Sequence, residues 1–249
     1  MDLETFKSIC VWWSVIAVCT FILLQFVTAP YGRHNSHKWG LEINNRTGWI
    51  LMEAPSFFIM LYYYLNYEIS LYAAVLFLAW LLHYLNRTFI FPFRIRTKGK
   101  KMPLAILGSA IGFNTINAGL NGYFIAALSN YTTANFYNWT FYFGVILFLI
   151  GMIINQVSDS ILINLRSPKE KDYKIPHGFM FKYISCPNHF GEMIQWLGFG
   201  IMAWNYAALA FFLWTLANLI PRALKHHKWY KANFNDYPVE RKSFIPKVI

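Results

Sequence analysis

Long apolar segments and shorter polar segments alternate along the chain. A helix of about 20 apolar residues is long enough to cross the hydrocarbon core of a bilayer. One apolar stretch, 189–221, is too long for a single crossing at about 1.5 Å of rise per residue, so we divide it near Trp204–Tyr206. The pattern then predicts seven membrane spans, over residues 8–28, 48–66, 69–91, 103–127, 137–158, 189–203 and 206–221.

These segments predict an all-α integral membrane protein, a bundle of seven transmembrane helices that forms a single multi-pass domain over residues 1–249. The residues ahead of the first span include Asp2, Glu4 and Lys7 and lack the basic cluster that opens a cleaved signal peptide. We therefore expect the first span to be retained.

The composition agrees with a membrane protein. Hydrophobic residues make up 57% of the chain, aromatic residues 20% and charged residues only 13%. A soluble domain of this length has too little interior to bury that much apolar surface, and a disordered chain has far less of it. The three cysteines form no CxxC pair, so neither a disulfide framework nor a structural zinc site is predicted.

The distribution of basic residues predicts the orientation. The chain has 22 Lys and Arg against 11 Asp and Glu, a net charge of +11. All Lys and Arg residues except Lys7 and Arg87 fall in alternate segments, 29–47, 92–102, 159–188 and 222–249. Basic loops stay on the cytosolic side of a membrane. We therefore predict that the N-terminus lies outside and the C-terminus in the cytosol, and we expect no nucleic-acid partner.

Ionisable residues inside membrane spans are costly and commonly functional. In the predicted topology they gather near the cytosolic ends of the spans, and they are Glu53, His83, Arg87, Asp159, Glu192 and Arg222. This polar level, with basic loops beside it, predicts a cavity for a large anionic cytosolic cofactor and a lipid-like substrate. Two simpler explanations stay open: single polar residues can hold helices together, and Glu53 can pair with Arg87.

Several familiar site motifs are absent. Neither GxGxxG nor a Walker loop occurs, which excludes a Rossmann or P-loop nucleotide site. His34 and His37 have a metal-like spacing without an acidic cluster, so no metal site is predicted. Within the second span, Pro55 follows Glu53 by two residues and is expected to hold the carboxyl in an irregular turn.

Other local strings are more specific. They are His83-Tyr84-Leu85-Asn86-Arg87-Thr88, Asn155-Gln156-Val157-Ser158-Asp159, Asn188-His189-Phe190-Gly191-Glu192 and a tail that contains Arg222, His226, Trp229-Tyr230, Phe234-Asn235-Asp236-Tyr237-Pro238, Arg241-Lys242 and Ile245-Pro246. In order and spacing, these strings resemble the steroid 5α-reductase family (3-oxo-5α-steroid 4-dehydrogenases) from about residue 50 to residue 249. Met52 departs from the pattern, because many animal members have Gln there.

The resemblance implies an NADPH-dependent reductase that transfers hydride to carbon 5 of a 3-oxo-Δ4 steroid. Negative charge then develops on the 3-keto oxygen, and hydrogen-bond donors aimed at that oxygen are the main electrostatic aid. By similarity, Tyr84 and Glu53 are the catalytic donors, the latter if burial keeps its carboxyl protonated. Glu53, Tyr84 and Asn114 are the expected substrate-binding residues. Carbon 4 is protonated by Tyr84 or by water, and the sequence leaves both open.

The same resemblance implies a set of NADPH-binding residues: Asn155, Asp159, Arg166, Tyr173, Asn188, Glu192, Arg222, His226 and Tyr230. Guanidinium groups can pair with phosphates, and carboxylates can accept hydrogen bonds from ribose hydroxyls or the carboxamide. His226 and His227 also fit an alternative role as an anchor at the membrane interface.

Other functions stay open on the sequence alone. They are reduction of another lipid double bond (in a sterol or a very-long-chain enoyl group), an isoprenylcysteine-type membrane methyltransferase, and a channel or transporter. The methyltransferase string Arg-His-Pro is absent, and Ser185-Cys186-Pro187 stands there. The expected partners are a lipophilic steroid that enters from the bilayer and membrane lipids, with no obligate protein partner. The expected location is a bacterial inner membrane or the endoplasmic reticulum.

Overall fold

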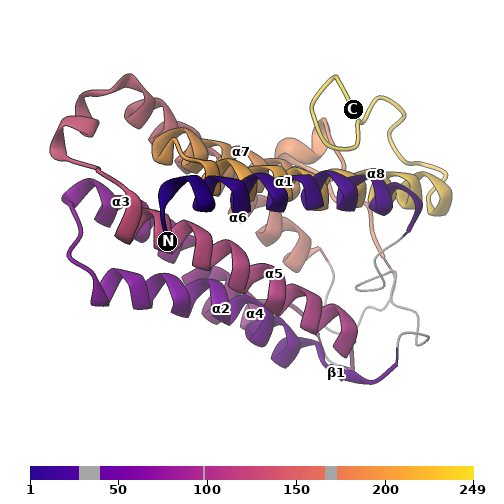
Figure 1. Cartoon of the computed structure of the whole chain (residues 1–249). Helices are drawn as coiled ribbons and strands as arrows, with labels where there is room; N and C mark the ends of the chain where they lie inside the picture. Colours follow the sequence, from indigo (N-terminus) through magenta and orange to yellow (C-terminus); the bar gives the residue numbers. More distant parts are fainter. Residues whose placement is uncertain (28–39, 98, 166–172) are drawn as a thin grey trace. The chain divides into compact units, whose positions relative to one another are not determined.

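The computed structural model describes residues 1–27, 40–97, 99–165 and 173–249 (Figure 1). Each of the seven predicted segments is mostly helical, and the helix that begins at Tyr206 continues to Asn233, past the predicted end at residue 221. The main helices are α1 (Leu3–Phe26), α2 (Asn45–Asn66), α3 (Leu71–Leu85), α4 (Phe91–Arg94), α5 (Leu104–Tyr123), α6 (Trp139–Asn164), α7 (Pro187–Ala203) and α8 (Tyr206–Asn233). Short π-helical or 3-10 segments are η2 (Asn86–Ile90), η3 (Phe124–Leu128), η4 (Thr133–Tyr137) and η5 (Phe179–Lys182). The all-α class is confirmed, apart from one short strand pair.

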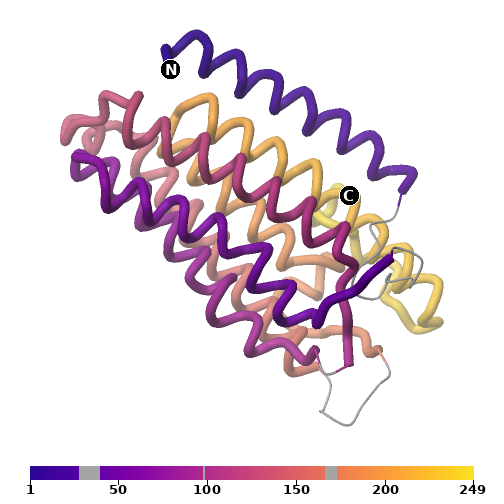
Figure 2. The backbone as a smooth tube through the Cα atoms, turned by 60° about the horizontal axis from the view of Figure 1, so that its bottom comes forward, coloured from indigo at the N-terminus to yellow at the C-terminus, as the bar shows by residue number. Residues whose placement is uncertain are grey.

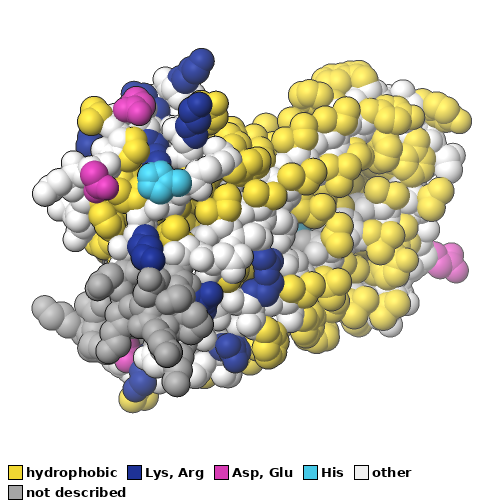
Figure 3. All heavy atoms as spheres, turned by 180° about the vertical axis from the view of Figure 1, so that it is seen from behind, with side chains coloured by type: hydrophobic (Ala, Val, Ile, Leu, Met, Phe, Trp, Pro, Cys, Tyr) yellow, Lys and Arg dark blue, Asp and Glu magenta, His cyan; other side chains and the backbone are white. Residues whose placement is uncertain are grey.

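Four helical segments in the described part of the chain are long and apolar enough to cross a membrane: Leu3–Phe26, Leu71–Arg94, Trp139–Asn164 and Tyr206–Asn233. Large apolar side chains are exposed along them, among them Trp12, Leu23 and Ile153. In the face shown in Figure 3, many exposed side chains are hydrophobic. A membrane protein is therefore confirmed, while seven crossings and their orientation stay predictions.

The chain folds as two compact units. The first comprises Met1–Val11, Ala29–Tyr142 and Ala203–Ala208, and the second comprises Trp12–Thr28, Phe143–Met202 and Leu209–Ile249. The prediction of a single domain stays a prediction.

In the first unit, α2 and α5 pack along each other (Figures 1 and 2). A short antiparallel pair of strands, β1 (Glu42–Asn44) and β2 (Lys101–Pro103), joins the starts of these two helices. Ile43 lies opposite Met102 in this pair. The strands form because each precedes its helix directly, so that pairing satisfies backbone groups that neither helix can. The alternation of apolar segments gave no sign of this ribbon, which is only three residues long on each side.

The predicted irregular turn at Pro55 is wrong, because α2 continues through it. Proline lacks the N–H that would bond to the carbonyl four residues earlier, and its ring disturbs that turn. Side chains of neighbouring helices donate to the carbonyls around it. Asn114 Nδ2 donates to the Met52 carbonyl at 2.5 Å, and Trp80 Nε1 donates to the Ser56 carbonyl at 3.1 Å. These hydrogen bonds tie the α2 turns around Pro55 to the neighbouring helices.

The predicted division near Trp204–Tyr206 is confirmed. Helix α7 ends at Ala203 and α8 begins at Tyr206. Trp204 between them has a positive φ of 43°, which a regular helix does not allow. Asn205 caps the new helix, since its side-chain oxygen accepts a hydrogen bond of 2.9 Å from the Ala208 amide.

In the second unit, α6 and α7 approach each other at backbone distance through four glycines. A Cβ atom on Gly144 would lie 2.7 Å from the Gly198 carbonyl oxygen, and one on Gly151 would lie 2.5 Å from the Gly191 carbonyl oxygen. Both helices carry their glycines seven residues apart, on one face. Small residues on such a face let two helices pack closely, as membrane helices often do.

Candidate active site

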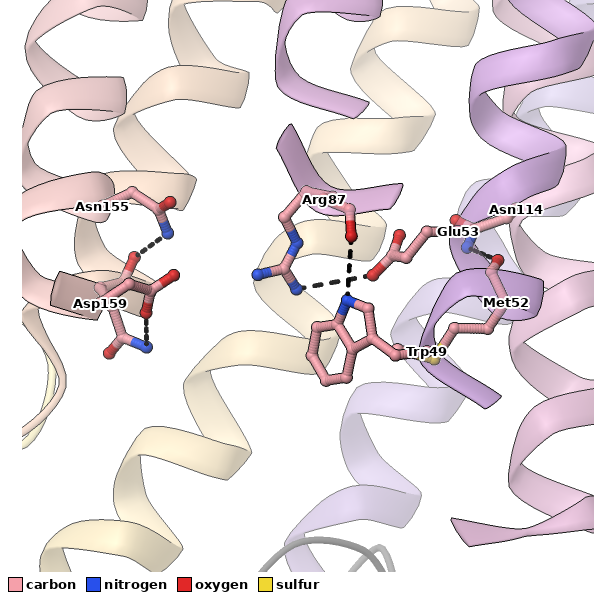
Figure 4. A network of polar contacts seen from close by, with 8 residues as sticks. Trp49, Met52, Glu53, Arg87, Asn114, Asn155 and Asp159 are labelled. Atoms are coloured by element: carbon pink, nitrogen blue, oxygen red, sulfur yellow. Dashed lines mark hydrogen bonds and ion pairs between the residues drawn. The ribbon is translucent and has the colours of Figure 1, made fainter. Parts of the chain in front are cut away.

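The first polar cluster lies in the first unit and consists of Trp49, Glu53 and Arg87 (Figure 4). Arg87 Nη2 lies 3.5 Å from Glu53 Oε1, and the two side chains are only 13% and 10% exposed. The Arg87 guanidinium also lies over two rings, at 4.7 Å from the Trp49 centroid and 4.8 Å from the Phe91 centroid. Carboxylate and aromatic rings together compensate the cost of burying the cation. The pairing of Glu53 with Arg87, one of the open explanations, is thus present.

Local helix geometry places these groups. Trp49 and Glu53 are four residues apart in α2 and therefore share a face. Arg87 lies in η2, a single π-turn after α3, where the helix register shifts by one residue. Trp49 Nε1 donates to the Arg87 carbonyl at 3.2 Å. The indole thus binds both the backbone and the side chain of the same arginine. π-turns of this kind occur often at functional sites.

Tyr84 lies one turn before Arg87, at the end of α3, and is buried. Its ring stacks on Trp80 with centroids 5.3 Å apart and an interplanar angle of 26°, and it meets the edge of the His83 ring at 5.0 Å. Trp80 is itself held by its hydrogen bond to the Ser56 carbonyl. The ring of the predicted catalytic tyrosine is therefore fixed by packing. Such preorganisation is what a donor to a developing charge requires.

Asn114 lies on α5 and is buried. Its amide nitrogen donates to the Met52 carbonyl, one residue before Glu53. The side chain thus lies beside the α2 turn that carries Glu53, and one of its donors is used inside the protein. Its predicted role toward a substrate stays a prediction.

The second polar cluster lies in the second unit and consists of Asn155, Asp159 and Asn188. Figure 4 labels Asn155 and Asp159 of this cluster. Asn155 Nδ2 donates to the Asn188 carbonyl at 3.0 Å, and Asn188 Nδ2 donates to Asp159 Oδ1 at 3.1 Å. Asn155 and Asp159 are buried and share one face of α6 at a four-residue spacing. The close contact between α6 and α7 allows these hydrogen bonds. A Cβ atom on Gly191 would lie only 2.5 Å from the backbone nitrogen of Asn155.

The remaining predicted cofactor residues of the second unit lie on α7, on α8 and in the segment before η5. Glu192 follows Asn188 by one turn of α7 and is half-buried. Arg222, His226 and Tyr230 follow each other at four-residue spacing on α8, which places them along one face. Arg166 lies outside the described residues.

Aromatic packing holds the far end of that α8 face. Tyr230 is buried and stacks on Tyr237, with centroids 5.3 Å apart and planes only 8° from parallel. Tyr173 meets the ring of Trp229 edge-on at 5.0 Å. Tyr173 and Tyr230 thus belong to one cluster of aromatic rings, which Trp229 joins, and the Tyr230 ring is packed inside it.

The polar atoms of the second unit fit a cofactor with hydroxyl and amide groups. Among the described residues, Asn155 Oδ1 and Ser158 Oγ are buried without a hydrogen-bond partner. Such atoms are rare in folded proteins unless a water or bound group satisfies them. Beside them, Asn188, Glu192, Arg222 and His226 are only half-buried and can be reached. Amide, carboxylate, imidazole and guanidinium groups together suit a nucleotide with ribose hydroxyls, a carboxamide and phosphates.

The sequence patterns do not predict two features of the site. Trp49 precedes Glu53 by one helical turn, a spacing from which it could be found. Ser185 stands out in the sequence only as a departure from a methyltransferase string. In the structure its hydroxyl contacts three groups, His227, Tyr237 and the Lys242 carbonyl.

Comparison with known proteins identifies the family. A family model described as 3-oxo-5-alpha-steroid 4-dehydrogenase matches residues 100–249. Steroid 5-alpha-reductase DET2 of Arabidopsis thaliana is 38% identical over 238 residues, which cover 92% of this chain and 91% of the relative. The chain belongs to the steroid 5α-reductase family.

Two further relatives lead to the same family. The 3-oxo-5-alpha-steroid 4-dehydrogenase 1 of Rattus norvegicus is 37% identical over 238 residues, with 94% of this chain and 92% of the relative covered. The DET2 protein of Solanum lycopersicum is 39% identical over 252 residues, with 98% and 97% covered. The resemblance that the local strings carried is thus confirmed. In this member of the steroid 5α-reductase family, the second polar cluster falls inside residues 100–249, and the first precedes them.

Proposed function

We propose that this chain is an NADPH-dependent reductase that converts 3-oxo-Δ4 steroids to 5α-reduced 3-oxosteroids. The observation that carries the proposal is the match along more than nine-tenths of the chain to relatives that are named for this activity. The fold supports it, because each unit contains a buried polar cluster within an otherwise apolar helical protein.

The chemistry of the reaction defines what the protein must do. NADPH supplies the hydride that is accepted at carbon 5. The acceptor carbon becomes electrophilic only when the conjugated 3-keto group is polarised, since an enolate oxygen develops in the transition state. The protein therefore has to hold the keto oxygen against a fixed donor, exclude water and deliver a proton to carbon 4.

Tyr84 is the donor in this proposal. Its ring is held by Trp80 and His83, and its phenolic O–H group can donate a hydrogen bond. Glu53 can donate to the same oxygen only when it is protonated, whereas the ion pair with Arg87 needs it ionised. The two states of Glu53 are alternatives, so Tyr84 is the donor common to both. Asn114 supports the α2 turn that carries Glu53.

The residues proposed to hold NADPH are those of the second polar cluster and the α8 face, together with Arg166. Asp159 and Glu192 suit ribose or carboxamide donors, and Asn155 Oδ1 is a buried acceptor of the same kind. Arg222 and Arg166 suit phosphates. The additional 2′-phosphate of NADPH adds charge that guanidinium groups recognise, so NADPH is expected to be preferred over NADH.

The membrane arrangement completes the proposal. Seven helices cross the bilayer, with the N-terminus outside and the basic loops and C-terminus in the cytosol. A lipophilic steroid enters from the bilayer, and the cofactor comes from the cytosol. The membrane is that of the endoplasmic reticulum or the bacterial inner membrane.

A steroid-panel assay tests the function. Purified protein in detergent or nanodiscs is incubated with NADPH, with NADH or with S-adenosylmethionine, and products are identified by mass spectrometry and by comparison with 5α and 5β standards. We expect 5α-reduced products with NADPH, much less with NADH and no methylated lipid. Products reduced only on other lipid double bonds, or transfer of a methyl group, would contradict the proposal.

A further inference from the structure

The Ser185 hydroxyl in the second unit is fully engaged by three neighbours. Ser185 Oγ lies 2.7 Å from His227 Nδ1 on α8, 2.6 Å from the Tyr237 hydroxyl and 3.1 Å from the Lys242 carbonyl oxygen. The residue is 3% exposed. Besides its carbon, a hydroxyl oxygen has one hydrogen and two lone pairs, so three hydrogen bonds saturate it.

The hydrogens of this group can be assigned by counting. A carbonyl oxygen only accepts, so the single Ser185 hydrogen is donated to Lys242. Both lone pairs of Ser185 must then accept, one from Tyr237 and one from His227. Burial raises the pKa of the Tyr237 phenol, which keeps it protonated and able to donate at neutral pH. His227 must therefore carry a hydrogen on Nδ1.

The same neighbours tie the C-terminal segment to the start of α7. Ser185 N donates to the Lys242 carbonyl at 2.8 Å, and Lys242 N donates to the Tyr183 carbonyl at 2.9 Å. Arg241 is buried, lies 4.9 Å over the Tyr237 ring and donates to the Pro176 carbonyl at 3.2 Å. The segment that follows α8 thus folds back as a short brace on residues 183–186.

The brace joins two elements that carry proposed cofactor residues. Ser185 precedes Asn188 by three residues, and His227 directly follows His226. Tyr237, which donates to Ser185, also stacks on Tyr230. One hydroxyl therefore connects the start of α7, the second half of α8 and the C-terminal segment.

We propose that Ser185 is a positioning residue for the cofactor: through His227 Nδ1–H and Tyr237 it holds the start of α7 and the α8 face in the arrangement that binds NADPH. The inference rests on the proposed function, since it concerns the same cofactor. Ser185 itself need not touch NADPH. Loss of the Ser185 hydroxyl should therefore weaken NADPH binding and leave steroid binding and turnover unchanged.

The first experiment removes and restores the hydroxyl. Ser185→Ala should raise the Kd for NADPH, followed by the fluorescence of the bound nucleotide, and the KM for NADPH each about 10-fold, the usual effect of losing a buried hydrogen-bonding group. The KM for the steroid, and kcat at saturating NADPH, should both stay within about twofold of their wild-type values. Ser185→Thr should restore most of the loss, and Tyr237→Phe should show part of it. Ser109→Ala is the matched control, because the Ser109 hydroxyl is exposed and bonds only to Ile106 in its own helix.

The second experiment tests the proton on His227 by substituting side chains of known shape. The amide nitrogen of Asn is bonded to Cγ, as Nδ1 of His is, whereas that of Gln lies one atom further out. His227→Asn should keep a KM for NADPH near wild type, and His227→Gln should raise it as Ser185→Ala does. His227→Asp has the shape of Asn with acceptors only and should behave like His227→Gln.

The outcomes separate this inference from the proposed function. A wild-type protein that shows no NADPH dependence at all refutes the function. With NADPH-dependent wild type, equal effects on the two KM values, or a lower melting temperature with no KM change, would refute positioning by Ser185. Equal behaviour of His227→Asp and His227→Asn would overturn the proton assignment. A raised KM for NADPH in Ser185→Ala and in His227→Gln, with Ser185→Thr and His227→Asn both near wild type, supports the inference.

Discussion

Tyr84 and Glu53 are held in different ways, and this difference decides what each can do. Tyr84 is fixed by ring contacts with Trp80 and His83. Glu53 faces a guanidinium at 3.5 Å, so its charge belongs to an ion pair. At the scale of single residues, the two side chains therefore predict different phenotypes.

Tyr84→Phe removes the hydroxyl and keeps the ring packed against Trp80. We expect kcat to fall by about 10²–10³, the usual cost of losing one donor to a developing oxyanion. The melting temperature and the KM for NADPH should change little. Steady-state kinetics on a 3-oxo-Δ4 steroid measures this, with Tyr62→Phe as the matched control because that tyrosine is exposed on α2. Full turnover of Tyr84→Phe would remove this residue from the mechanism.

Glu53→Gln leaves Arg87 without its carboxylate in a largely buried place. We expect a loss of about 2–3 kcal/mol in unfolding free energy, slightly below the usual range for a broken buried pair because the Trp49 and Phe91 rings still contact the cation. The double variant Glu53→Gln/Arg87→Gln should recover part of that stability, since no single charge remains buried. Thermal unfolding in detergent measures both. If the double variant loses as much unfolding free energy as the two single variants Glu53→Gln and Arg87→Gln lose together, the ion pair has no structural role.

At the scale of elements, the alternation of apolar and polar segments predicted every long helix, because burial in a membrane imposes length and apolarity directly on the sequence. Even the break at Trp204 was predicted, from length alone. The strand ribbon and the continuous helix through Pro55 were not, because both depend on partners from distant segments, such as Asn114. The pairing of Glu53 with Arg87 could be anticipated as one option, whereas the Ser185 network could not, since Ser185 and Lys242 are 57 positions apart.

Gly191 is the test of the α6–α7 contact. Gly191→Ala places a Cβ atom 2.5 Å from the backbone nitrogen of Asn155, so α6 and α7 must separate. We expect a destabilisation of about 1–3 kcal/mol and a raised KM for NADPH, because Asn155 and Asn188 move apart. Gly108→Ala is the control, since nothing lies within 4 Å of a Cβ there. If Gly191→Ala and Gly108→Ala have the same melting temperature and the same KM for NADPH, the close approach of α6 and α7 at Gly191 is not needed for stability or for cofactor binding.

At the scale of the whole molecule, the basic segments predict the orientation. A reporter fused after Ile249 should be active in the cytosol, and one inserted near Asn130 should be active outside, because the segments around them differ in Lys and Arg content. An insertion at an exposed site such as Asn130 should leave the fold intact. Both reporters on the same side of the membrane would rule out seven crossings.

The central claim is that this chain adds hydride from NADPH to carbon 5 of a 3-oxo-Δ4 steroid and a solvent proton to carbon 4. Isotope transfer tests it most directly. Turnover with NADPH that carries deuterium on the transferable position of its nicotinamide, in ordinary water, should give a 5α product with one deuterium at carbon 5. Turnover with unlabelled NADPH in heavy water should place deuterium at carbon 4. A product with cofactor deuterium at carbon 4, or with solvent deuterium at carbon 5, would contradict the account.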